Sequence, residues 1–518
     1  MSTKEPGELR MLSIRHAIAI GVGTGVGLIV LLSAAAWAAG GFPSLRRDSE
    51  FTSATLFELL KLVFAVVGGI GGVVGLVMLY RKQRIAEAAD ERSHAAKLLA
   101  DIADARAALA AERDVVRLFN ERFAKAAEQL GSDKAAIRLS GVYAMAGLAD
   151  DWTHGRQTCI EVLCAYLRLP YTTPDGEGEE QDKARAERQV RYTVIRILRD
   201  RLRPDAKVSW QGHDLNFTGA TFDGGDFSGA EFSAGDVTFR ACRFVAGVVD
   251  FTRTRFTGAR VSFLEATFSG SEVWFQGSEF DSGVVDFSLT KVLEGTLDFT
   301  DANLSGGELR WEHARIESLV AFRRTEFEGG KLNLEHATIT GMLDFDQAAV
   351  HGTEMRLSRI VITEQGGLFF NRCTDVHARL DLKALNLEDG RLVFRECVLE
   401  TQIDFFDARL MGGRVEFLRS TVGEVLFTST RLQGARLSFE DSQIRGPLDF
   451  SRAVLNSGAL SFAGARFDGG QATFHAARVG QVELRAEENS KLDLSGALLT
   501  PAVLSQLRER KLPGVLLP

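Results

Sequence analysis

The sequence predicts a mainly β protein with α-helices: a right-handed β-helix of quadrilateral, rectangular cross-section, preceded by two transmembrane helices and a helical neck and bundle. Three observations lead to this fold. Phenylalanine recurs every five or seven residues after residue 216, two long stretches near the N-terminus contain no charged residue, and an alanine-rich segment with heptad spacing separates the two regions. The composition of the 518-residue chain, 45% hydrophobic and 25% charged, is that of a globular protein.

Residues 17–42 and 62–80 are the two uncharged stretches. The shorter one gives ~28 Å of α-helix, close to the ~30 Å hydrocarbon thickness of a bilayer. Neither stretch has the polar face that a buried core helix would need. We therefore predict two transmembrane helices, with an N-terminal segment at 1–16 and a short external loop at 43–61.

Basic residues flank the two predicted spans and favour a location of both chain ends in the cytoplasm. The stretch AWA at 36–38 also fits a signal-peptide cleavage site, so a cleaved first span is the alternative. Cleavage would still leave everything after Tyr80 in the cytoplasm. The flanking basic residues are Lys4, Arg10 and Arg15 before the first span and Arg81, Lys82 and Arg84 after the second.

Both spans contain glycines at GxxxG spacing, and small faces of this kind let helix backbones approach closely. A tight hairpin or a dimer is one interpretation, and the ordinary abundance of Gly in membrane helices is the other. The glycines are Gly21, Gly23, Gly25 and Gly27 in the first span, and Gly68, Gly71, Gly72 and Gly75 in the second.

Residues 81–131 are predicted to form a long helical neck, because small and apolar residues recur at alternating steps of three and four. This heptad seam could pair with a second copy of the chain or fold back onto the helices that follow. The seam consists of Ala95, Leu98, Ile102, Ala105, Leu109, Val116, Phe119, Phe123, Ala126 and Leu130, with Glu112 at the one polar position.

A small helical bundle is expected at 132–204. Ser132 is predicted to cap its first helix, its second helix ends before Pro170, and its third stops at Pro204. Residues 171–183, YTTPDGEGEEQDK, are predicted to be a flexible acidic linker.

The repeat begins with Phe at steps of five and then settles into a unit of twelve residues, F-x-x-A-x-F-x-G-G-x-V-x. Two units make a coil of 24 residues, so residues 24 apart should stack in neighbouring coils, and V-x-F should place both side chains on one face of a strand. About ten coils, a rod of ~50 Å, are expected over 208–499, with one-residue slips near Phe322, Phe345 and Phe405. The predicted interior positions include Phe217, Phe222, Phe227, Phe232, Phe239, Phe251, Phe263, Phe275, Phe287, Phe299, Trp311, Leu357, Phe369, Phe394, Phe417, Phe439, Phe462 and Phe474.

An antiparallel sandwich of twelve-residue hairpins is the competing fold, but a sandwich has no reason to repeat one residue type at one period over so long a segment. Cys242, Cys373 and Cys397 follow repeat Phe residues by three positions and should replace a small buried residue there. A helix at 500–512, with Thr500 as its N-cap, should close the end of the rod.

Several segments resemble the pentapeptide-repeat proteins, whose consensus A-(D or N)-L-x-x forms a right-handed quadrilateral β-helix. ATFDGGDFSGAEF matches with Phe in the Leu position, and DANLSG (301–306) and DLSGA (493–497) match directly. Together with EQLGSDKAAIRLSGVYAMAGLADDW and VLCAYLRLPY, the layout is most similar to membrane-anchored pentapeptide-repeat proteins of actinobacteria. The resemblance implies the fold, the layout and a location in the bacterial inner (cell) membrane, with two spans and both chain ends in the cytoplasm. That group has no agreed activity.

The sequence predicts no catalytic residue, no cofactor and no metal site, because no metal-binding or nucleotide-binding motif is present. His313 and His336 occupy equivalent positions, WEHARI and LEHATI, and are interpreted as a repeated surface position. Five Cys without a CxxC motif suit a reducing compartment.

The expected function is that of a non-enzymatic, membrane-embedded scaffold that presents the β-helix to an unknown protein partner, with a homo-oligomer through the Gly-rich spans and the neck as a further option. The net charge of −8 argues against a nucleic-acid partner. Residues 211–500 hold 42 Asp and Glu against 29 Lys and Arg, however. Resemblance to soluble pentapeptide-repeat proteins that mimic DNA and bind topoisomerases therefore leaves an acidic mimic as one alternative. An enzyme with a site at the junction of neck and β-helix is the other.

Overall fold

The computed structural model describes residues 13–43, 52–374, 379–510 and 512–518. The chain divides into two compact units, Met1–Arg117 and Leu118–Pro518, which are described separately. Residues 1–12 of the predicted N-terminal segment, with Lys4 and Arg10, and residues 44–51 of the predicted loop lie outside the described residues.

Two helices are long and apolar enough to cross a membrane, judged by length and composition: α1 (Ile14–Ala39) and α2 (Ser53–Leu130). The 78 residues of α2 include both the predicted second span and the predicted neck. The helix begins inside the predicted loop and continues through Tyr80, because the change from apolar to polar residues there introduces no helix breaker. A Cβ on Gly21 would lie 3.1 Å from Val73 Cγ1, so α1 and α2 touch at this glycine, whereas a Cβ on the other GxxxG glycines would meet nothing within 4 Å.

The end of α2 shares one hydrophobic core with three further helices: α3 (Ala135–Asp151), α4 (Arg156–Arg168) and α5 (Glu179–Leu202). Two helix boundaries in the structure differ from the predicted ones. Ser132 is not the N-cap, because α3 begins at Ala135, and the Ser132 hydroxyl accepts the Lys134 N–H at 3.3 Å instead. The last residues of the predicted linker 171–183 are helical, since three acidic side chains in the first turn of α5 suit a helix N-terminus.

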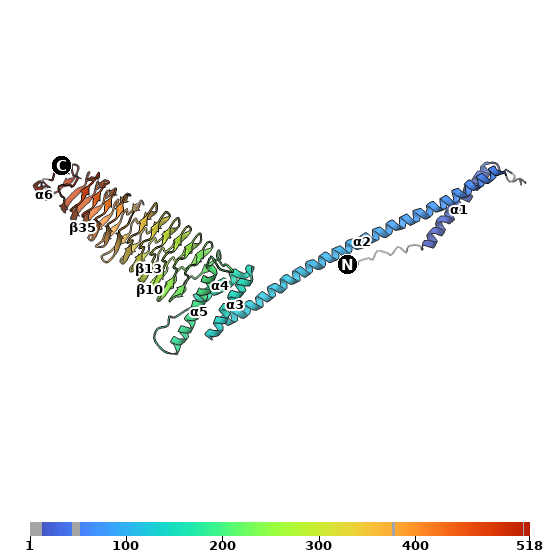
Figure 1. Ribbon diagram of the computed structural model, residues 1–518, viewed down its shortest axis with the longest axis horizontal. Helices are drawn as coiled ribbons and strands as arrows, with labels where there is room; N and C mark the ends of the chain where they lie inside the picture. Colours follow the sequence, from blue (N-terminus) through green and yellow to red (C-terminus); the bar gives the residue numbers. More distant parts are fainter. Residues whose placement is uncertain (1–12, 44–51, 375–378, 511) are drawn as a thin grey trace. The chain divides into compact units, whose positions relative to one another are not determined.

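The rest of the chain is a β-solenoid of about 13 turns (Figure 1). Every strand pairing is parallel, which excludes the antiparallel sandwich, and Val261 lies beside Val285 as the 24-residue coil predicts. The predicted ten coils were too few. Several coils after Asn303 are shorter than 24 residues, as in the pairing of Asn303 with Glu326, and at ~4.8 Å per step 13 turns span ~62 Å.

One face of the solenoid is a 14-stranded sheet. Its strands, in order, are β1 (Leu215–Asn216), β5 (Asp236–Thr238), β9 (Arg260–Ser262), β12 (Val284–Asp286), β15 (Glu308–Arg310), β19 (Lys331–Asn333), β23 (Glu354–Arg356), β26 (Leu380–Asp381), β30 (Ile403–Asp404), β34 (Val425–Leu426), β37 (Leu448–Asp449), β40 (Ala472–Thr473), β42 (Leu492–Asp493) and β44 (Val515–Leu516). The other sides consist of shorter sheets and of strands that continue around a corner. Five such eight-residue strands are β10 (Thr267–Trp274), β13 (Lys291–Asp298), β35 (Arg431–Ser438), β38 (Val454–Ser461) and β41 (Arg478–Arg485).

The interior consists of columns of stacked rings, which explains the spacing of Phe in the sequence. Phe239, Phe263 and Phe287 are buried and stack at centroid distances of 4.7 and 4.6 Å. The predicted interior position Phe369 was wrong by one residue, whereas Phe370, the repeat Phe three residues before Cys373, lies in the column. Phe370, not Phe369, stacks on Phe345 at 4.7 Å and on Phe394 at 4.9 Å, because the coil between Phe345 and Phe370 is longer than its neighbours.

Each corner after a repeat Phe is a tight turn. The Cys242 N–H donates to the Phe239 carbonyl, and Ala241 between them has φ of 53°, the positive φ of a type II turn. The buried residue that ends the turn is small, and at several corners it is a Cys, Ser or Thr whose side chain donates to the carbonyl of the repeat Phe one coil earlier. Examples are Cys242 to Phe217, Thr254 to Phe227, Ser278 to Phe251, Cys397 to Phe370, Thr430 to Phe405 and Ser442 to Phe417.

The far end of the solenoid is covered by α6 (Pro501–Arg510), whose Val503 and Leu507 are buried. The chain then returns as β44, which pairs with β42. Thr500 directly precedes α6, but its hydroxyl donates to the Gly480 carbonyl at 3.1 Å rather than capping the helix.

Candidate functional site: the capped end and the surface of the solenoid

The first coil presents backbone carbonyls at the open end of the solenoid, and side chains from α4 and α5 donate to them. Such an edge would otherwise be free to pair with another chain. The helices α3, α4 and α5 lie at this end (Figure 1). The donors are Gln157 to Asp214 at 3.0 Å, Arg168 to Asn216 at 3.2 Å, Arg191 to Thr221 at 2.8 Å, Arg188 and Tyr192 to Asp223 at 3.0 and 2.8 Å, and Arg203 to Ser228 at 3.3 Å.

A buried polar network fixes α5 and the linker to the solenoid. Asp223 is 3% exposed, and its carboxylate accepts the Tyr171 hydroxyl at 2.7 Å and lies 3.1 Å from Arg188 Nε. The Arg191 guanidinium lies over the Tyr171 ring, 4.5 Å from its centroid. Burial, together with the hydrogen bond to Asp223, raises the pKa of the Tyr171 phenol, and burial lowers the pKa of Arg191. These groups form an anchor for the helices.

The sequence indicates this cap only indirectly. Arg188, Arg191 and Arg199 recur along the helix that precedes the repeat, on a stretch that must face the open end of the solenoid. Arg188 and Arg191 donate to backbone carbonyls, which no motif marks, and Arg199 pairs with the Asp226 carboxylate. These pairings become visible only in the folded chain.

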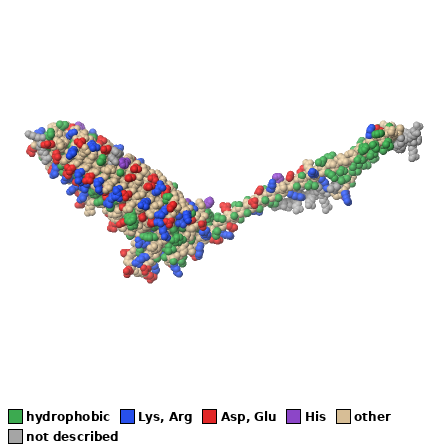
Figure 2. Space-filling model, in the orientation of Figure 1, with side chains coloured by type: hydrophobic (Ala, Val, Ile, Leu, Met, Phe, Trp, Pro, Cys, Tyr) green, Lys and Arg blue, Asp and Glu red, His purple; other side chains and the backbone are tan. Residues whose placement is uncertain are grey.

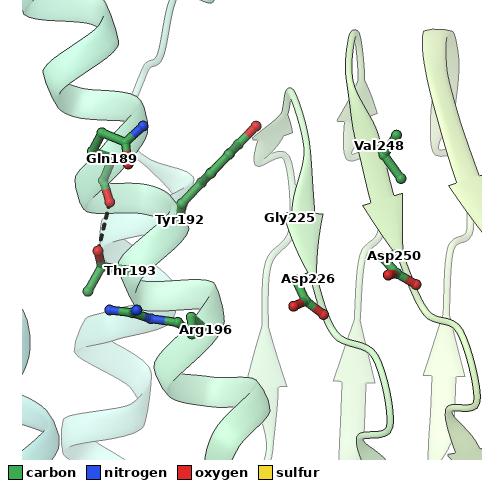
Figure 3. A pocket seen from close by; sticks show the side chains of 8 residues that line it. All are labelled: Gln189, Tyr192, Thr193, Arg196, Gly225, Asp226, Val248 and Asp250. Carbon is green, nitrogen blue, oxygen red and sulfur yellow. Dashed lines mark hydrogen bonds between the residues drawn. The ribbon is translucent and has the colours of Figure 1, made fainter.

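A groove of about 590 Å³ lies between α5 and the first coils (Figure 3). Gln189, Tyr192, Thr193 and Arg196 form one wall, and β3 (Gly225–Asp226) and β7 (Val248–Asp250) form the other. The helix lies close to the strand backbone, since a Cβ on Gly224 would be 2.3 Å from the Tyr192 hydroxyl.

The polar groups of this groove are held in structural contacts. Asp226 pairs with Arg199, the Thr193 hydroxyl donates to the Gln189 carbonyl at 2.8 Å, and Arg196 donates to the Tyr143 hydroxyl at 2.8 Å. Asp250 accepts the Thr252 N–H at 2.7 Å. The lining of this groove includes no Ser, Cys or His.

Many acidic side chains of the solenoid cap its turns. In each case the Asp directly precedes a repeat Phe or Leu, and its carboxylate accepts the backbone N–H of the residue two positions later. The hydrogen bond from Ser495 lowers the pKa of Asp493. The Asp residues are Asp226, Asp250, Asp286, Asp298, Asp344, Asp381, Asp404, Asp449 and Asp493.

Other acidic residues pair with arginines of the next coil. Arg255 lies between Glu231 and Glu279, at 3.4 and 2.9 Å, and Arg324 lies 2.7 Å from Asp301. Acidic and basic side chains alternate over the solenoid face shown in Figure 2. The face in view thus carries no continuous acidic stripe, the feature that a DNA mimic requires.

The His pair lies at equivalent corners of neighbouring coils. The rings of His313 and His336 are parallel with centroids 4.7 Å apart, and Arg359 Nη1 lies 3.4 Å from His336 Nε2. Among the described residues, no group of three or more His, Cys, Asp or Glu side chains is suited to hold a metal ion.

All five cysteines are buried and free. Burial raises the pKa of Cys159 to about 11 and the pKa values of Cys164 and Cys242 to about 12, so these thiols stay protonated near neutral pH. Cys373 and Cys397 donate to carbonyls of the preceding coil at 3.0 and 3.1 Å, in the small buried position that the sequence predicts for them.

Two solved structures are similar to part of this chain. Both are trypsin-treated variants of QnrB1, a plasmid-mediated fluoroquinolone resistance protein, and each shares 16% sequence identity with it. The first match covers 53% of this chain and 97% of that chain with a TM-score of 0.14, and the second covers 38% and 96% with a TM-score of 0.12. At such values the likeness carries no argument about function. No family model and no curated protein matches the sequence.

Proposed function

We propose that this protein is a non-enzymatic scaffold, anchored in the bacterial cell membrane, that presents its β-solenoid to a protein partner in the cytoplasm. One observation carries the proposal: the single helix α2 contains a highly apolar segment, and its C-terminal end is part of the bundle that caps the solenoid. A membrane that contains the apolar segment would therefore also tether the solenoid, because both are joined by the same helix. The resemblance to membrane-anchored pentapeptide-repeat proteins supports the same layout.

Both chain ends are placed in the cytoplasm by the proposal, with α1 and the first part of α2 spanning the membrane. Arg81, Lys82 and Arg84 directly after the apolar segment support this orientation. The buried, protonated thiols are compatible with a reducing compartment.

The surface supports a protein partner better than nucleic-acid mimicry. Several acidic residues that would supply a DNA-like field pair with arginines, such as Glu231 and Glu279 with Arg255, and this weakens the field they produce. Phe406, by contrast, is 47% exposed at a corner where the neighbouring coils carry Lys383 and Thr428. An exposed aromatic side chain at an otherwise polar position is typical of protein contacts.

Proximity labelling from a tag after Pro518, in intact cells, tests the proposal. A reproducible set of cytoplasmic proteins is expected, with one partner lost from the set in a Phe406→Ser variant and retained in a Lys383→Ser variant. A topoisomerase in the labelled set would favour the mimic instead. Labelling confined to proteins outside the cytoplasm would overturn the orientation.

A further inference from the structure

The heptad seam of α2 changes its surroundings along the helix. From Phe119 onward the protein's own bundle covers the seam: Phe119 contacts Trp152 with ring centroids 3.8 Å apart, and Ala126 is 1% exposed. From Ala95 to Val116 the same seam lies on the surface. Leu98 is 62% exposed and Leu109 is 53% exposed.

An exposed apolar stripe on a helix is stabilised when a second element covers it. In the heptad, Ala95, Ile102, Leu109 and Val116 occupy the a positions, and Leu98, Ala105 and Glu112 occupy the d positions. This pattern is self-complementary, because in a parallel pair each a or d residue meets the same residue of the other copy.

We propose that a second copy of the chain covers this segment and forms a parallel, in-register, two-stranded coiled coil over 95–116. β-branched Ile102 and Val116 at a, with Leu98 at d, favour two strands over three or four. The heptad continues without interruption into the part of the helix that the bundle covers, so the coiled coil ends where the intramolecular packing begins.

The charged residues beside the seam favour a parallel orientation of the two helices. Asp101 is at a g position and Arg106 is at the e position five residues later, the spacing at which g and e residues of parallel chains meet. An antiparallel pair would instead bring e residues together, and Arg106 and Arg113 both occupy e. Shared insertion into one membrane would also make two copies parallel; this clause alone rests on the proposed function.

Disulfide cross-linking of the full-length protein in membranes tests the dimer, with Ala105→Cys at d and Ala107→Cys at f as matched variants. The native cysteines are buried, so the introduced thiol dominates oxidation. Ala105→Cys should yield several-fold more cross-linked dimer than Ala107→Cys. Equal yields, or no dimer from either variant, would overturn the proposal.

Two further variants test direction and register. Ile102→Cys and Leu109→Cys should each cross-link to the same position of the second copy, whereas an antiparallel pair would cross-link at most near one central position. Glu112→Leu removes the one polar core residue and should increase the yield from Ala105→Cys; a decrease would count against the coiled coil. Separation of the same samples into membrane and soluble fractions distinguishes the two proposals. Cross-linked protein in the soluble fraction would support the dimer and contradict the membrane anchor.

Discussion

Arg191 of α5 donates from Nη2 to the carbonyl of Thr221 at 2.8 Å, across 30 positions of sequence, and from the same nitrogen to the Leu167 carbonyl at 2.7 Å. The guanidinium is thus the central contact among α4, α5 and the first coil. Its side chain is 3% exposed, so water cannot replace these hydrogen bonds if it is removed.

Replacing Arg191 with Met should lower the free energy of unfolding by about 2–4 kcal/mol, because it leaves Asp223 with one fewer nearby positive charge and two carbonyls without a donor. Chemical denaturation of the full-length protein in detergent measures the loss. The control is Arg240→Met, which removes an exposed pair with Glu265 and should cost at most about 1 kcal/mol. Similar losses for both variants would show that the cap does not depend on Arg191.

Adjacent phenylalanines in β25 (Gly367–Asn371) should respond differently to truncation. Phe370 is 3% exposed and stacks between Phe345 and Phe394, so Phe370→Ala should cost about 3–5 kcal/mol. Phe369→Ala, at a half-buried position, should cost clearly less. Thermal unfolding of the two variants under one set of conditions makes the comparison, and the reverse order would contradict the assignment of the column.

Thr430 tests the hydrogen bond that links the corner of one coil to the next. Its hydroxyl donates to the Phe405 carbonyl at 2.9 Å in a buried site. Thr430→Val keeps the shape and removes the donor, so a loss of about 1 kcal/mol is expected. Thr218→Val at an exposed corner is the matched control and should leave the denaturation midpoint unchanged.

Acid should weaken the solenoid through its capping and paired carboxylates. Hydrogen bonds from Ser495 and Arg324 hold the pKa values of Asp493 and Asp301 below the usual range. A lowered folded-state pKa contributes stability above the unfolded value of about 4 and loses it as the pH falls through the folded value. Stability should therefore change little between about pH 7 and pH 5 from these groups and fall below about pH 4.

The pH effect is measured from denaturation midpoints across this range. Asp493→Asn keeps an acceptor for the Ser495 N–H and removes the titrating group. It should therefore flatten part of the fall below about pH 4. A fall of equal size in the variant would assign the acid sensitivity to other carboxylates.

The sequence alone determined the features that depend on local period. The length of the two uncharged stretches indicated the two apolar helical segments. Apolar residues at alternating steps of three and four indicated the helix of the neck. Phe at steps of five and seven indicated the stacked columns and the 24-residue coil. At Ser132 the predicted helix start was wrong, because α3 begins at Ala135. Thr500 directly precedes α6 as predicted, but its hydroxyl donates to the Gly480 carbonyl, a contact that only the folded chain provides.

Only the tertiary structure decided which residues meet across long separations. It decided between the adjacent Phe369 and Phe370 for the column, since one additional residue in a coil changes which side chain faces inward. It showed that α5 donates to the carbonyls of the first coil, and that the bundle covers the seam of α2 only from Phe119 onward. The physical reason is that periodicity fixes which face of an element is apolar, whereas the partner of that face depends on contacts between segments that are distant in the sequence.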